Sequence, residues 1–149
     1  MELKSPAFKD SKYIPKKYTC AGEDISPPLE IYDVPANARN LVLMVNDPDA
    51  PNGDWVHWLL WNIDPRTSFI EKDSVPEGAI AGVTSAGIHS YSGPCPAEGT
   101  HVYIFKLYAL DILLPDNSTL KKHQIKEMME GHVLDKAVLK GFYETEYMV

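Results

Sequence analysis

The sequence is poor in cysteine, in positive charge and in long apolar runs. Its 149 residues include only two cysteines, and 14 Lys and Arg stand against 21 Asp and Glu, for a formal net charge of −7. The longest apolar run, Leu41 to Val45, is far shorter than the roughly 20 residues that a membrane helix needs. Nucleic acid is a poor ligand for an acidic chain without a Lys/Arg cluster, because phosphate contacts supply most of that affinity. We therefore expect one soluble domain over residues 1–149, with no membrane span and no nucleic-acid partner.

The few cysteines also limit metal chemistry. Cys20 and Cys95 are 75 positions apart, and neither has a second Cys or His at zinc-finger spacing. Residues 1–10 lack the apolar stretch of a secretory signal, so the expected compartment is the cytoplasm, where free thiols are the default. A disulfide between the two cysteines requires the fold to bring them together, and both states stay open. No metal and no cofactor is expected.

What the chain does contain is a series of short segments separated by 12 prolines and 9 glycines. Helical spacing appears only late, in Lys121–Glu130, which Gly131 would cap, and in Val133–Lys140. Many strands followed by short C-terminal helices predict a mainly β, β-rich α+β fold. The clearest strand patterns are residues 41–45, 56–63 and 101–110, with weaker ones in the first 40 residues and around 80–83.

Two of these predicted strands begin with a histidine beside a proline-rich loop. His57 begins one, and the two-residue period of a strand places Leu59 and Trp61 on its face. His101 begins the other and shares its face with Tyr103. Each histidine therefore heads an apolar face, where a polar side chain needs a partner. A histidine at a strand start is often only structural, but two of them beside such loops suggest a site.

Two aspartates strengthen this interpretation. Asp47 and Asp49 follow the strand of residues 41–45 and would reach the same end of the sheet as His57 if the two strands are neighbours. A carboxylate beside an imidazole fixes its tautomer and favours the cationic form, which suits an anion. Backbone N–H groups of the loops would add further donors.

Three stretches, found in order, make the chain resemble the phosphatidylethanolamine-binding protein (PEBP) family, also called the Raf kinase inhibitor protein family. The likeness is to its short bacterial and archaeal members. The resemblance implies a β-sandwich of antiparallel sheets with short peripheral helices. The stretches are Tyr18–Leu29 with Val34-Pro35, Asp47–Pro51 with Trp55–Trp58, and Gly93–Pro96 with Gly99–Phe105 and Leu107–Asp111, and Gly131–Leu134 follows near the end.

The resemblance also implies a small pocket that accepts phosphate, acetate or a phospholipid head group. It further implies a cis Ala50–Pro51 bond, and it favours proximity of the two cysteines, which lie in shared motifs. Val102 replaces an Arg that is usual in the family, which removes a positive charge at the pocket rim or on the sheet surface. By motif, the pocket residues are Asp47, His57, Gly93, Pro94, His101 and Tyr103, with Asp49 and Trp55 as wall residues.

Three classes of function stay open. The leading prediction is a non-catalytic binding module for a small anionic or phosphorylated ligand, which regulates or inhibits a kinase or a serine protease; a homodimer stays open. The alternative is a hydrolase that uses the His/Asp cluster, with or without a divalent metal. The chain has no nucleophile elbow, HExxH motif or Gly-rich phosphate loop, which disfavours the hydrolase. A purely structural partner protein is the third class.

Overall fold

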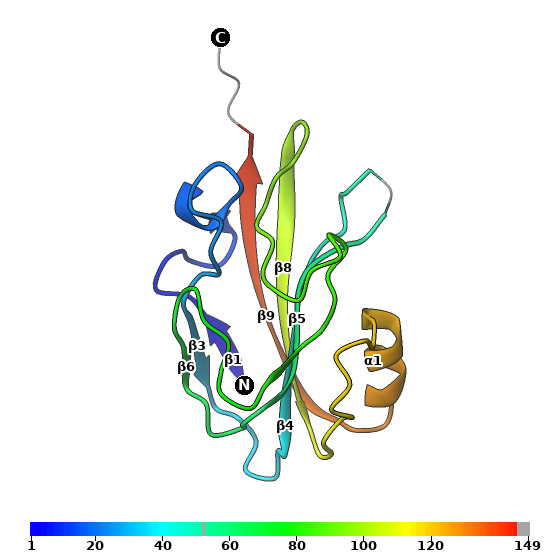
Figure 1. Ribbon diagram of the computed structural model, residues 1–149. Coiled ribbons are helices and arrows are strands. Elements are labelled where there is room, and N and C mark those ends of the chain that lie inside the picture. Colours follow the sequence, from blue (N-terminus) through cyan, green and yellow to red (C-terminus); the bar gives the residue numbers. More distant parts are fainter. Residues whose placement is uncertain (52, 146–149) are drawn as a thin grey trace.

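Two sheets pack against each other across a shared apolar core in the computed structural model, which describes residues 1–51 and 53–145 (Figure 1). Neighbouring strands are antiparallel, except that β2 runs parallel to β9. The mainly β class predicted from the sequence is confirmed. The smaller sheet has the order β1 (Glu2–Lys4), β3 (Leu29–Tyr32), β6 (Phe69–Ile70). The larger has the order β2 (Lys12–Tyr13), β9 (Val133–Glu144), β8 (Thr100–Leu110), β4 (Asn40–Asp47), β5 (Trp55–Ile63), β7 (Ile80–Ala81).

Strand β4 is buried along its whole length because both faces of the larger sheet are covered there. On one face, Leu43 and Val45 pack into the core shared with the smaller sheet. On the other face, Val42 and Met44 pack under helix α1 (Lys122–Met129), which is separated from the smaller sheet by the larger one (Figure 1). Burial on both faces explains why this strand reads as a continuous apolar run.

Helix α1 forms where the sequence predicts it. It buries Ile125 and Met129 against the larger sheet, and Gly131 follows its end with φ +80°, a left-handed conformation that glycine adopts without a steric cost. A short 3-10 turn, η1 (Lys16–Tyr18), lies near the N-terminus. Within the described part of the chain, no helix is long and apolar enough to cross a membrane.

The second predicted helix is wrong, because Val133–Lys140 belongs to strand β9. This strand pairs with β8 from Thr100 to Leu110, and its burial alternates with a period of two over residues 136–141. The spacing of its apolar residues also fits one helical face. The long ladder to β8 satisfies the main-chain hydrogen bonds of the segment, and this tertiary pairing overrides the local preference.

Candidate functional site

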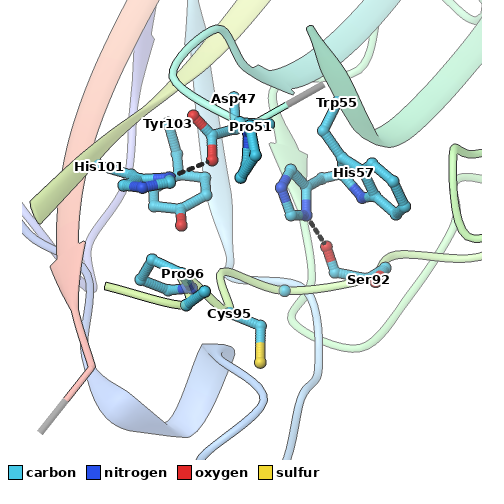
Figure 2. Close-up of a pocket in the computed structure, with 12 residues that line it drawn as sticks. Asp47, Pro51, Trp55, His57, Ser92, Cys95, Pro96, His101 and Tyr103 are labelled. Carbon is cyan, nitrogen blue, oxygen red and sulfur yellow. Dashed lines mark hydrogen bonds and ion pairs between the residues drawn. The ribbon is translucent and has the colours of Figure 1, made fainter. Parts of the chain in front are cut away.

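A cavity of about 270 Å³ opens at the end of the larger sheet where β4 ends and β5 and β8 begin (Figure 2). Its walls come from these strands, from the β4–β5 loop and from the segment 92–97. The predicted residues that line it are Asp47, Trp55, His57, Gly93, His101 and Tyr103. The structure therefore brings together residues from three segments of the sequence, at 47–57, at 93 and at 101–103.

A β-bulge at the start of β5 directs His57 into this cavity. The pairing with β4 skips one residue of β5 between Val56 and Trp58, and His57 is that extra residue. His57 consequently lies on the same side of the sheet as Trp58, whereas Leu59 and Trp61 pack on the α1 side. The predicted common face of His57, Leu59 and Trp61 is wrong, because the bulge shifts the alternation by one residue.

The His57 ring is buried and has one defined tautomer. Its Nδ1 lies 2.5 Å from the carbonyl oxygen of Ser92. Because a carbonyl oxygen only accepts, Nδ1 carries the proton, and Nε2 is the ring nitrogen left for a ligand. Burial lowers the pKa of His57 below its ordinary value, although the Ser92 carbonyl and the Asp47 carboxylate act in the opposite direction. The ring is thus neutral near pH 7, contrary to the expected cationic form.

Asp47 holds the second imidazole. It is buried at the end of β4, and its Oδ2 accepts a hydrogen bond from Nδ1 of His101 at 2.7 Å. Its Oδ1 accepts the backbone N–H of Asp49, whose own carboxylate accepts the N–H of Val102. Asp49 therefore joins the β4–β5 loop to β8 and is outside the cavity lining. The side chain of Val102 alternates with Tyr103 along β8, so it lies on the opposite sheet surface and not at the pocket rim.

Tyr103 lies between the two imidazoles (Figure 2). Its ring centroid is 5.2 Å from that of His57 and 6.4 Å from that of His101. Its hydroxyl is buried and has no hydrogen-bond partner among residues 1–51 and 53–145. Burial raises the pKa of this phenol and Asp47 and Asp49 add to the effect, whereas a backbone contact with Cys95, outside normal hydrogen-bond geometry, opposes it, so the group stays protonated and can donate. Leaving such a group unpaired costs on the order of 1–3 kcal/mol, a cost that a hydrogen bond to a ligand atom in the cavity would offset.

The segment from Ser92 to Pro96 forms the opposite wall and is attached to the N-terminal part of the chain. The N–H of Gly93 donates to Oδ1 of Asp24 at 2.8 Å, and the carbonyl of Pro94 accepts the N–H of Cys20 at 3.1 Å. A disulfide joins Cys20 to Cys95. Gly93 therefore lines the cavity but does not offer its N–H to a ligand, contrary to the expected loop donors, and Pro94 is buried outside the lining.

Some lining residues were missed by the sequence reasoning. Ser92 contributes through its carbonyl, and Pro51 and Pro96 contribute apolar wall. The last two lie inside the motifs quoted above, which is the signal that could have identified them. The Ala50–Pro51 bond is trans, the form that most X–Pro bonds favour, so the expected cis bond is wrong.

Comparison with known proteins agrees with this architecture. A UPF0098 protein of Methanothermobacter thermautotrophicus is 45% identical over 148 residues, covering 96% of this chain and 98% of that protein. The crystal structure of CT736 from Chlamydia trachomatis, described as a PEBP homologue, superposes with a TM-score of 0.94 at 42% identity and 97% coverage of both chains. Escherichia coli YbcL, described as a new member of the mammalian PEBP family, gives 0.90 at 26% identity, covering 97% of this chain and 98% of that one.

The phosphatidylethanolamine-binding protein family profile matches residues 4–144, nearly the whole chain. The two structures above share the arrangement of sheets over almost their full length. The chain therefore belongs to the phosphatidylethanolamine-binding protein family.

Proposed function

We propose that this protein is a non-catalytic binding protein whose pocket holds a small anion, such as a phosphate, a carboxylate or a phospholipid head group. The observation that carries this proposal is the buried hydroxyl of Tyr103, between His57 and His101, which has no hydrogen-bond partner in the part of the chain that the structure describes. The regulation of a kinase or a serine protease in the cytoplasm is the role that family membership favours.

The chemistry of the pocket suits an anion. Both imidazoles use Nδ1 within the protein, at Ser92 and at Asp47, so both can present Nε2 to a ligand. The Asp47 carboxylate accepts the Nδ1 proton of His101 at 2.7 Å and so fixes the orientation of that ring. A bound anion would then accept a hydrogen bond from the buried Tyr103 hydroxyl, beside the two imidazoles that line the same cavity.

A hydrolase fits these residues less well. Within the described residues, no three side chains of His, Cys, Asp or Glu are grouped so that they could share a metal ion. The thiol of Cys95 is tied into the disulfide. The hydroxyl groups of the cavity lining belong to Ser92 and Tyr103, and within the described residues neither is hydrogen-bonded to His57 or His101, which could activate it as a nucleophile.

The test is a titration with inorganic phosphate and with phosphoethanolamine, followed through the imidazole NMR signals. We expect saturable shifts of His57 and His101, and none of His123, which lies on α1 beyond the larger sheet. Replacing His57→Ala or His101→Ala should abolish binding, whereas the matched His123→Ala variant should retain it. Unmoved signals of both pocket histidines would contradict the proposal. Inhibition assays with a kinase and a serine protease then test the regulatory part.

A further inference from the structure

One side of strand β9 lies outside the apolar cluster beneath helix α1. The strand residues in that cluster and packed against it come from β4, β5, β7 and β8, and within residues 1–51 and 53–145 none comes from β9. The core residues of β9 point toward the smaller sheet, so the side chains between them point to the α1 side of the larger sheet. These side chains are Lys136, Val138, Lys140 and Phe142, and all but the half-buried Phe142 are exposed.

Basic and apolar side chains alternate on this side of the sheet, along β9 and across its ladder with β8. The cross-strand pairs are Lys136 with Tyr108, Val138 with Lys106, Lys140 with Ile104, and Phe142 with Val102, and we call these residues the β8–β9 face. Each lysine thus has an apolar or aromatic residue directly opposite. The ammonium group of Lys136 lies 5.6 Å from the centroid of the Tyr108 ring. The exposed ring of Tyr13 extends the apolar part beside Phe142, with 6.3 Å between the ring centroids.

The lysines of the β8–β9 face have few carboxylates near them, and within the described residues none of the three forms an ion pair. Burial lowers the pKa of Lys106, and the charges of three neighbouring lysines add to this effect, namely Lys136, Lys122 and Lys126. Asp54 opposes the shift, but it already pairs with Lys122. The carboxylates at the borders of the face accept hydrogen bonds from backbone N–H groups or a hydroxyl of β8 and β9, and they belong to Asp10, Asp49 and Glu144. A chain with a net charge of −7 thus gathers ammonium groups on one surface.

We propose that the β8–β9 face binds an acidic segment of a partner protein, in which apolar side chains stand between the carboxylates. The ammonium groups attract the carboxylates, and exposed apolar side chains such as Val138 give the partner's apolar residues a surface to bury. This surface is separate from the anion pocket, because Val102 and Ile104 alternate along β8 with the pocket residues His101 and Tyr103. The proposal therefore goes beyond the anion-binding function and does not depend on it.

Other occupants fit the face less well. A symmetric dimer through this face would bring the same lysines together from both copies. An anionic bilayer repels a chain with a net charge of −7. A nucleic acid would pair with the lysines but would leave the apolar side chains between them without a partner.

The test is a titration of the isotope-labelled protein with short synthetic peptides at low ionic strength, followed through its backbone NMR signals. The first peptide alternates Glu and Leu between Gly-Ser ends, the second has Gln in place of Glu, and the third has Ser in place of Leu. We expect the first peptide to shift the signals of residues 102–108 and 136–142 and to bind less tightly as salt is added. The second peptide should cause no shift, and the third should bind more weakly than the first. Absence of any shift with the first peptide, shifts only outside the face, or equal binding of all three peptides overturns the proposal.

Charge variants assign the binding to the face. The double variant Lys106→Gln with Lys136→Gln should bind the first peptide on the order of fivefold more weakly, because it loses two exposed ion pairs. The matched double variant Lys4→Gln with Lys9→Gln removes the same charge beside a different cavity and should keep the wild-type affinity. Equal affinities of the two double variants would overturn the proposal. So would a concentration-dependent dimer of the wild-type protein, or binding to phosphatidylserine vesicles, that Lys106→Gln with Lys136→Gln abolishes. The phosphate titration of His57 and His101 reports on the anion pocket separately.

Discussion

At the scale of single residues, two buried tyrosines differ in how their hydroxyl groups are hydrogen-bonded. The Tyr103 hydroxyl is buried and has no hydrogen-bond partner among the described residues, whereas the hydroxyl of Tyr91, also a buried residue, donates to the carbonyl oxygen of Tyr18 at 2.7 Å. The same chemical group thus lacks a hydrogen bond within the described residues in Tyr103 and makes one in Tyr91. An unpaired buried hydroxyl destabilises the folded protein, and a paired one stabilises it. The unpaired state of the Tyr103 hydroxyl is the one that the proposed anion binding requires.

The variants Tyr103→Phe and Tyr91→Phe should consequently change stability in opposite directions. We expect Tyr103→Phe to raise the free energy of unfolding by about 1 kcal/mol and to weaken phosphate binding. Tyr91→Phe should lower the free energy of unfolding by about 1–2 kcal/mol, because it leaves the Tyr18 carbonyl unpaired. Urea denaturation without added anion measures both. A loss of stability in Tyr103→Phe as large as that in Tyr91→Phe would show that the Tyr103 hydroxyl is paired.

At the scale of elements, the site depends on the fit between the segment 92–96 and the N-terminal part of the chain. Gly93 approaches that part so closely that a Cβ atom would lie 2.5 Å from Asp24 Oδ1 and 2.5 Å from the carbonyl oxygen of Tyr18. The Tyr18 carbonyl oxygen and the Cα atom of Thr19, which would lie 3.0 Å away, belong to the backbone and cannot move aside as the Asp24 side chain can. Gly93 therefore positions the cavity wall because it lacks a Cβ atom, and its N–H donates to Asp24 and not to a ligand.

Gly93→Ala should displace this wall. We expect a loss of about 1–3 kcal/mol in the free energy of unfolding, as for other overpacked sites, together with weaker phosphate binding. Gly82→Ala provides the control, because its Cβ would meet the side chains of Trp61 and Leu59 at 2.6 and 2.8 Å, away from the cavity. That variant should lose stability and keep its affinity for phosphate. Equal affinities of both variants for phosphate would argue against the positioning role of Gly93.

At the scale of the whole molecule, the Cys20–Cys95 disulfide connects the N-terminal third of the chain to the cavity wall. The cross-link spans 75 positions, so it removes much conformational freedom from the unfolded chain. The cytoplasm, which is the compartment expected from the sequence, keeps most protein thiols reduced. Reduction of this pair would therefore lower the stability of the folded molecule.

The variant with both Cys20→Ser and Cys95→Ser should unfold more easily. We expect its free energy of unfolding to fall by about 2–4 kcal/mol relative to the oxidised protein. Dithiothreitol should shift the wild-type urea curve in the same direction and leave the curve of the double variant unchanged. If dithiothreitol has no effect on the wild-type curve, the two thiols are not paired in solution.

Much of the fold was predictable because the relevant signals are local. The apolar run at 41–45, the strand patterns at 56–63 and 101–110, and the helix ended by Gly131 are all present in the structure. Strand β9 was not predictable in this way. Its apolar spacing fits a helix face as well as a strand, and only its pairing with β8 decides between them.

The sequence by itself determined the chemical content of the site, because the residue types and their motifs name His57, His101, Asp47 and Tyr103. The tertiary structure alone decided how these groups act. The extra residue in β5 turns His57 into the cavity, and burial keeps that ring neutral. The Gly93 N–H, expected to donate to a ligand, is used by Asp24 instead. The alternation of side chains along β5, the protonation of His57 and the hydrogen-bond partner of the Gly93 N–H all depend on atoms that are distant in the chain. For that reason, no local pattern in the sequence encodes them.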